Sequence, residues 1–297
     1  MNDKELRELN PWSHVDVDDI LRTDVIEKQL DSANAYVSRV KETREKKSEI
    51  EVLNSLGKKN DKYRFHFELP PEPWQGNPLT AKVVILTLNP GYVKEANIIS
   101  AKLLKSAGWN EELSKYKKKV LDLEAESLMP EIKATNDIDK ISLFDAFNTL
   151  GDWYWVDKLK DLRDAYIAKK KGSGMNDIEL ENEFYSKIAI VEYCAYTSQC
   201  FSDSTKIENL PTVEFIKDLV WHIEANKKAL FVILRAKGKW EAVLHKGTLD
   251  DSSRCVVNNN ISQNLSRNNL KLKEGSSREG DKEPFDIILD KLLEEKE

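Results

Sequence analysis

Asn89-Pro90-Gly91-Tyr92 directly follows the apolar run VVILTL at residues 83–88. Because proline fixes φ and glycine permits positive φ, this tetrapeptide predicts a sharp turn at the end of a buried strand. Such a strand would hold the Asn89 side chain at a fixed point in a pocket. The alternative interpretation of Asn-Pro-Gly is an ordinary turn.

Chemically useful side chains also follow the other apolar runs of the chain. Carboxylates, hydroxyls, carboxamides, aromatic rings and bases occur within 192–199, 235–240 and 258–267. Ligands of open α/β sheets bind beyond the carboxyl ends of the strands. We therefore expect these residues to converge on one edge of a sheet.

The elements that must position them are strands alternating with helices. Strands are expected at 82–88, 141–147, 187–196, 228–234 and 253–260. Near-continuous β-branched and aromatic runs are typical of parallel strands covered on both faces. Helical patterns lie at 94–107, 110–128, 157–170, 176–186, 211–226, 237–245 and 284–296. This alternation favours an α/β fold, a three-layer α/β/α sandwich with a mainly parallel central sheet.

The remaining segments suggest how the chain is organised. Residues 24–56 have the spacing of one or two amphipathic helices, and the proline-rich segment 67–78 predicts an extended lead-in to the core. We expect an N-terminal helical extension over 1–62 and one α/β/α domain over 63–297, with a helical insertion at about 94–140.

Composition excludes several classes of protein. The 297 residues are 40% hydrophobic and 33% charged, which is typical of a soluble globular protein. No apolar run approaches the roughly 20 residues that span a bilayer, and the charged N-terminus lacks a signal peptide's apolar segment. A cytoplasmic protein without a membrane partner is expected.

Metal and cofactor signatures are absent from the sequence. The three cysteines form no Cys-x-x-Cys pair, and the four histidines are scattered. Reduced, mostly structural thiols are the simplest interpretation. The sequence also lacks a Gly-x-Gly-x-x-Gly fingerprint, a Walker loop and a Gly-x-Ser-x-Gly elbow. We therefore expect no metal and no cofactor.

The net charge of −6 counts against a general nucleic-acid binder, whose surface is usually basic. Three stretches nevertheless contain bases and no acid: 73–94, 225–240 and 252–273. Buried strands exclude acids in any case, which accounts for part of each stretch. The bases in the flanking loops indicate a local anionic ligand.

The opening motif resembles a known family. LTLNPGY (86–92) is similar to the first motif of the uracil-DNA glycosylase superfamily, in its Gly-φ-Asn-Pro-Gly form. The preceding 71–86 contains a Gly-x-Pro element like the family's lead-in, and 229–244 resembles its later strand and helix. CVVNNNISQNLSRNNL (255–270) stands where the family carries an insertion loop. Thr87 replaces the leading glycine of the motif, and no His-Pro-Ser is present.

The resemblance implies a DNA-repair enzyme that flips a base and hydrolyses its N-glycosidic bond without a metal. Asn89 would orient the water, and Asn258 or Asn259 would donate to the departing base. The base would contact Pro90, Gly91 and Tyr92, with Tyr92 stacking on it, as well as Glu192 and Tyr193. Glu192, in place of a base-reading asparagine, would accept hydrogen bonds from an N–H-rich base edge.

The same resemblance implies residues that hold the nucleic acid. Ile261 or Leu265 would enter the vacated stack, and bases would hold phosphates. The implied nucleic-acid contacts are Lys94, Arg235, Lys237, Ile261, Ser262, Leu265 and Arg267. The partner would be single- or double-stranded DNA, or a nucleotide.

Two alternatives remain open from the sequence. One is a non-catalytic nucleic-acid or nucleotide-binding protein that keeps the fold, which the missing His-Pro-Ser and the acidic net charge favour. The other is hydrolysis of a free nucleoside or nucleotide, with the basic stretches holding one phosphate. The sequence identifies neither the base nor the role of the N-terminal helices.

Overall fold

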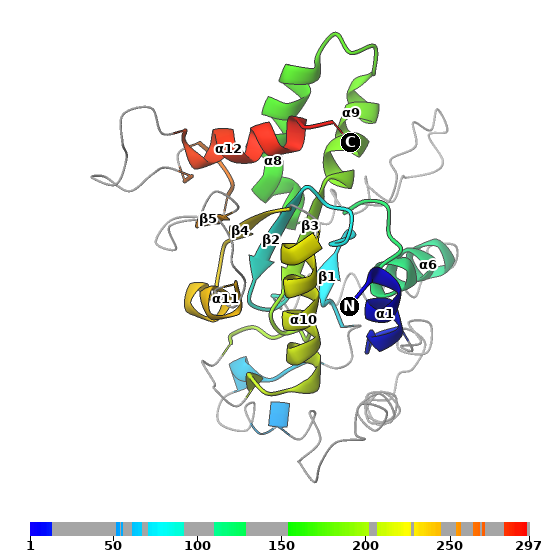
Figure 1. The fold of residues 1–297 in the computed structure, drawn as a ribbon, viewed down its shortest axis with the longest axis vertical. Coiled ribbons are helices and arrows are strands. Elements are labelled where there is room, and N and C mark those ends of the chain that lie inside the picture. The colour runs from blue at the N-terminus through cyan, green and yellow to red at the C-terminus, as the bar shows by residue number, and fades with distance from the viewer. Residues whose placement is uncertain are drawn as a thin grey trace, which may run out of the picture. The chain divides into compact units, whose positions relative to one another are not determined.

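The structure is a computed structural model of the chain (Figure 1). The expected strand at 141–147 and helix at 94–107 lie outside the residues it describes, as does most of 24–56. The structure describes residues 1–13, 52–53, 55, 61–66, 71–91, 110–128, 154–201, 207–226, 229–244, 254–256, 264–267, 269–270 and 282–295.

The described residues form a mixed α/β protein around a sheet of five strands in the order β1-β3-β2-β4-β5. β2 pairs with β4, and β4 pairs with β5, both in parallel. Val83 lies opposite Leu230, and Phe231 lies opposite Arg254. The strands are β1 (Trp74–Gln75), β2 (Val83–Thr87), β3 (Ile188–Glu192), β4 (Leu230–Ile233) and β5 (Arg254–Val256).

The strand predictions at 82–88, 187–196, 228–234 and 253–260 are confirmed in part, since each contains a shorter strand, and β3 and β5 occupy only the first half of theirs. Every residue of β2, β3 and β4 is buried. Burial on both faces explains why these strands are apolar throughout and do not alternate with polar residues. β1 lies at the edge of the sheet. Edge strands tolerate neighbouring prolines, so this position agrees with the proline-rich sequence of the lead-in.

The described residues contain seven α-helices and one short 3-10 helix at Asp61–Tyr63. The helix predictions at 157–170, 176–186, 211–226, 237–245 and 284–296 are confirmed, with ends that differ by at most three residues, whereas the helix expected at 110–128 ends at Leu121. The helices are α1 (Asp3–Leu9), α6 (Asn110–Leu121), α8 (Tyr154–Lys170), α9 (Asp177–Ser186), α10 (Pro211–Asn226), α11 (Lys237–Leu244) and α12 (Pro284–Leu293).

The chain divides into two compact units, each assembled from three segments. The first contains Met1–Gln75, Leu88–Ala125 and Val191–His222. The second contains Gly76–Thr87, Glu126–Ile190 and Ile223–Glu297. The boundary predicted at residues 62 and 63 stays a prediction.

The second unit has a core built from strand and helix side chains. Figure 1 shows α8 and α9 as a helical hairpin, and α12 contacts both α8 and β2. Ile85, Leu159 and Phe184 share a buried cluster with Ile288 of α12. Gly76 precedes β2 with φ of +72°, where an added Cβ would lie 2.7 Å from the carbonyl oxygen of Ile188.

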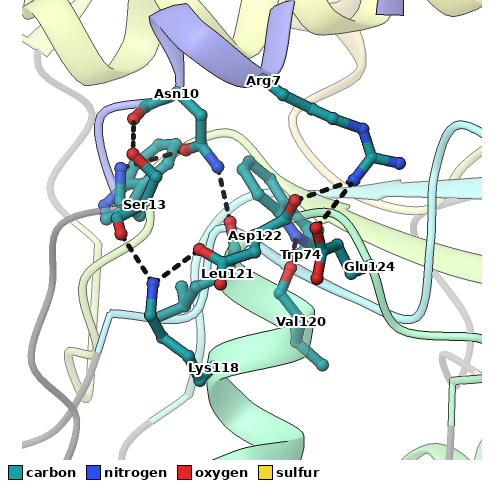
Figure 2. A network of polar contacts seen from close by, with 10 residues as sticks. Arg7, Asn10, Ser13, Trp74, Lys118, Val120, Leu121, Asp122 and Glu124 are labelled. Carbon is teal, nitrogen blue, oxygen red and sulfur yellow. Dashed lines mark hydrogen bonds and ion pairs between the residues drawn. The ribbon is translucent and has the colours of Figure 1, made fainter. Parts of the chain in front are cut away.

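In the first unit, the N-terminal segment fastens onto the end of helix α6 (Figure 2). The last carbonyl groups of a helix have no partner within it. Here Trp74 Nε1 donates to Val120 O, Asn10 Nδ2 to Leu121 O and Arg7 Nη1 to Asp122 O. Side chains from outside the helix therefore satisfy three successive carbonyls.

Helix α1 lies within the N-terminal helical extension expected over 1–62, although the sequence showed helical spacing only at 24–56. Asn2 accepts a hydrogen bond from Glu5 N, and the Glu5 carboxylate accepts one from Asn2 N, which is a capping box. Leu6 and Trp12 are fully buried, and the Trp12 ring lies edge-on to Trp74, 5.3 Å between centroids. Packing in this unit therefore stabilises a helix of only two turns.

None of the helices in the described part of the chain is long and apolar enough to cross a membrane.

Candidate functional site

Asn89 lies two residues beyond the end of β2, and its side-chain nitrogen is held from three sides. Nδ2 donates to the Ser198 hydroxyl at 2.9 Å, to Pro90 O at 3.0 Å and to Tyr196 O at 3.4 Å. None of the described residues donates a hydrogen bond to Asn89 Oδ1. The side-chain nitrogen of Asn89 thus donates to three acceptors, whereas Oδ1 accepts no hydrogen bond from a described residue.

Hydrogen-bond chemistry fixes which way this amide faces. Two of the three partners, Pro90 O and Tyr196 O, are carbonyl oxygens and can only accept. If the amide were turned over, Oδ1 would face those two oxygens and both would lose a donor. The arrangement therefore selects one orientation of Asn89.

A backbone frame holds the residues on either side of Asn89. Cys194 N donates to Leu88 O at 2.9 Å, and Ser198 N donates to Pro90 O at 3.2 Å. Gly91 and Ser198 also form a parallel bridge. The segment that follows β3 therefore lies alongside the segment that follows β2.

The opposite side of the 197–200 segment is also paired. Phe65 and Ser198 form an antiparallel bridge, and His66 N donates to Thr197 O at 2.9 Å. Cys200 N donates to Lys62 O at 2.8 Å. Ser198 is thus flanked by backbone partners on two sides, which leaves it little freedom to shift.

The positive φ expected of Gly91 is wrong, since the positive-φ glycines of the described chain are at other positions. Instead of turning, the backbone at Gly91 runs beside Ser198. An added Cβ at Gly91 would meet no atom within 4 Å, so the backbone there is open. The buried Pro90 supplies a carbonyl to the frame.

Glu192 and Tyr193 both lie inside the protein at the end of β3. Glu192 is 4% exposed and its backbone N donates to Pro73 O. Burial raises the pKa of Tyr193, and the nearby Glu208 and Glu214 carboxylates raise it further. The phenol is therefore neutral at physiological pH, and in this conformation both side chains are covered.

The second unit holds the other described residues of the implied nucleic-acid contact. Arg235 is exposed just beyond β4, and Lys237 is exposed at the start of α11, 3.6 Å from Glu241. Leu265 is fully buried in the core, so in this conformation it cannot enter a base stack. Arg267 pairs with Asp286 at 2.7 Å and lies over the Phe285 ring, so a carboxylate offsets its charge.

Six further residues from the sequence analysis lie outside the described part of the chain. They are Tyr92, Lys94, Asn258, Asn259, Ile261 and Ser262. Within the described residues, no group of three or more His, Cys, Asp or Glu side chains could hold a metal ion.

Ser198 is the site residue that the sequence analysis did not single out. Its hydroxyl contacts Asn89, and it is 1% exposed. The only signal in the sequence is its place in the polar run after a buried strand, which it shares with several neighbours.

Comparisons with family models, with curated proteins and with solved structures find no significant match for this chain.

Proposed function

We propose that this protein is a DNA glycosylase-like enzyme that hydrolyses the N-glycosidic bond of a flipped base, with Asn89 positioning the water. The observation that carries the proposal is the fixed amide of Asn89 at the carboxyl end of a parallel strand. An acceptor oxygen held in one orientation can hold a water molecule with a lone pair directed at the sugar. The fold we propose is a three-layer α/β/α sandwich, in a cytoplasmic protein.

The reaction requires little proton transfer before the bond breaks. The C1′–N bond breaks with its electron pair leaving on the base, and the sugar becomes oxocarbenium-like. The water held by Asn89 Oδ1 forms the new C1′–O bond and then releases a proton. The departing base takes up a proton from solvent, so the products are the free base and an abasic sugar.

The departing base anion needs hydrogen-bond donors. Asn258 and Asn259 are the residues we propose for this role, and Glu192 with Tyr193 for contact with the base. Since Glu192 and Tyr193 are buried, a flipped base reaches them only after a displacement of the residues that cover them. That displacement adds to the few kcal/mol that flipping itself costs.

A second candidate is a non-catalytic nucleic-acid or nucleotide-binding protein. Two described residues favour it, because Leu265 is buried and Arg267 is already paired with Asp286. A protein that binds one nucleotide needs neither a wedge nor a row of free bases. Hydrolysis of a free nucleoside or nucleotide is compatible with the same two observations.

Base release from labelled oligonucleotides tests the proposal. Single- and double-stranded substrates would carry uracil, hypoxanthine, xanthine or a mismatched thymine, beside the Asn89→Ala variant. We expect release by the wild type, a loss of about 100-fold or more in the variant, and nearly unchanged DNA affinity. A parallel fall in rate and affinity would contradict the role of Asn89.

Salt dependence separates the candidates if no base is released. Affinity for a strand falls steeply with salt, because each neutralised phosphate releases counterions. Salt-sensitive strand binding without release would favour the non-catalytic protein. Release from free nucleosides or nucleotides with little salt dependence would favour the small-substrate hydrolase.

A further inference from the structure

We infer that Ser198 is a positioning residue that sets the direction in which the Asn89 amide faces. Its effect on base release rests on the proposed function, whereas its effect on the amide does not. Of the three groups that accept from Asn89 Nδ2, Ser198 supplies the single side chain. It is therefore the partner that a substitution can remove without altering the backbone.

The hydroxyl of Ser198 has one hydrogen, and that hydrogen is engaged. Ser198 Oγ donates to Cys200 O at 3.1 Å. Ser198 Oγ therefore has only a lone pair left for Asn89, and it accepts a hydrogen bond from Asn89 Nδ2 at 2.9 Å. The order of donors and acceptors runs in one direction, from Asn89 through Ser198 to Cys200.

This order of donors and acceptors disfavours the orientation in which Asn89 Oδ1 and Nδ2 exchange places. With Oδ1 turned toward Ser198, the serine hydrogen would have to leave Cys200 O to meet it. Pro90 O and Tyr196 O would then face the amide oxygen, and their lone pairs would repel it. A serine whose hydrogen is engaged elsewhere thus excludes the amide rotamer that would hide the acceptor from a ligand.

The position of Ser198 itself is fixed before any ligand binds. Its backbone bridges to Phe65 on one side and to Gly91 on the other, and its side chain is buried. A group held in this way needs no rearrangement during the reaction, which is the condition for effective preorganisation.

The chain offers a matched control next to this residue. Thr197 is buried like Ser198, but its hydroxyl makes no hydrogen bond to a described residue. Thr197→Val removes a hydroxyl from the same segment without touching Asn89. Ser198→Ala removes the hydroxyl that accepts from Nδ2.

The first measurement does not depend on activity. The Asn89 side-chain NH₂ signals in a ¹⁵N–¹H spectrum would be assigned by their disappearance in Asn89→Ala. We expect Ser198→Ala to shift them and to speed their exchange with solvent, while Thr197→Val leaves them in place. Unchanged signals in Ser198→Ala would overturn the inference whether or not any base is released.

The second measurement is a double-mutant cycle on base release. We expect Ser198→Ala to slow release about tenfold at unchanged DNA affinity, and to cost nothing further in the Asn89→Ala background. Equal losses in both backgrounds, or no loss with shifted signals, would overturn the positioning role. If the wild type releases no base, the proposed function fails, and the spectrum alone decides whether Ser198 orients the amide.

Discussion

The side-chain nitrogen of Asn89 lies 2.9 Å from the hydroxyl oxygen of Ser198, although the two residues are 109 positions apart in the sequence. The contact forms because β2 and β3 are neighbours in the sheet, so the segments that follow them run side by side. The segment after each strand contributes one residue of the contact. The sheet thus places a carboxamide and a hydroxyl together in the region where open α/β sheets bind ligands.

Glu192→Gln should change which base the protein prefers to release. The variant keeps the size of the side chain but replaces an acceptor-only carboxylate with an amide that also donates. We expect preference to move away from N–H-rich base edges. Ratios of release rates across the oligonucleotide panel measure this, and an unchanged ratio with a lower overall rate would assign Glu192 a structural role.

The sheet could be predicted from the sequence because a strand buried on both faces is apolar at every position and not only at alternate ones. The apolar runs at 82–88, 187–196 and 228–234 are short and rich in β-branched and aromatic residues, which favours strands covered on both faces. The structure places β2, β3 and β4 within them. The observed strands are shorter than the runs. Tyr193 and Cys194 continue the apolar pattern beyond β3, but Cys194 bonds to Leu88 in the frame around Asn89.

The orientation of the Asn89 amide could not be predicted, because it depends on where hydrogens point. A run of polar residues after a strand does not reveal that Ser198 donates to Cys200 O and accepts from Asn89. Gly91 was misread for a related reason. Asn-Pro-Gly is typical of a turn, yet pairing with Ser198 keeps the backbone out of the positive-φ region.

Gly76→Ala should strongly destabilise the protein. The residue has φ of +72°, and an added Cβ would lie 2.7 Å from Ile188 O and 3.0 Å from Leu128 Cα, neither of which can move aside easily. We expect a loss of about 2–5 kcal/mol in the free energy of unfolding, from backbone strain and overpacking. Urea unfolding measures it.

Gly238→Ala is the matched control for that experiment. Gly238 lies in helix α11, where an added Cβ meets no atom within 4 Å. Since alanine is the better helix former, this variant should be neutral or gain up to about 1 kcal/mol. Equal effects of the two substitutions would show that the crowding at Gly76 is unimportant.

Asn10→Ala and Asn10→Asp should both loosen the N-terminal segment from α6. Asn10 is 2% exposed, donates to Leu121 O and accepts from Trp12 N. Alanine removes both hydrogen bonds, at a cost of about 2–4 kcal/mol. Aspartate keeps the acceptor but places a negative charge at the carboxyl end of a helix, where the helix dipole is also negative.

The two variants should therefore differ in their response to pH. At pH 7 we expect Asn10→Asp to be at least as unstable as Asn10→Ala. On acidification the new carboxyl gains a hydrogen that it can donate to Leu121 O, so the loss in free energy of unfolding of Asn10→Asp should become smaller.

The control is Lys4→Ala, which removes an exposed ion pair with Glu8 and should change the free energy of unfolding by less than about 0.5 kcal/mol. A pH-independent gap between the Asn10 variants would contradict this account.

A partly buried ion pair in the second unit predicts a specific acid sensitivity. Lys187 Nζ lies 3.0 Å from Glu183 Oε1, and it also donates to the Tyr166 hydroxyl and to Leu292 O. Burial raises the pKa of Glu183, but Lys187, Tyr166 and Lys170 together outweigh it, so the net shift is downward from 4.5. Burial lowers the pKa of Lys187, and the Glu183 carboxylate partly opposes that shift.

Because the folded-state pKa of Glu183 lies below its unfolded value, its carboxylate stabilises the fold above about pH 4.5. That contribution is lost as pH falls through the folded-state pKa. Glu183→Gln imitates the protonated acid, so we expect it to be less stable than wild type by about 1–3 kcal/mol at pH 7. Urea unfolding between pH 3 and 7 should show the two curves converging at the acid end.

Asp157→Asn is the control, because Asp157 forms an exposed pair with Lys158 in the first turn of α8. Such pairs contribute little, so this variant should follow the wild type within about 0.5 kcal/mol at every pH. A gap between wild type and Glu183→Gln that stays constant down to pH 3 would show that the glutamine is poorly accommodated. It would then follow that the carboxylate charge of Glu183 does not stabilise the pair with Lys187.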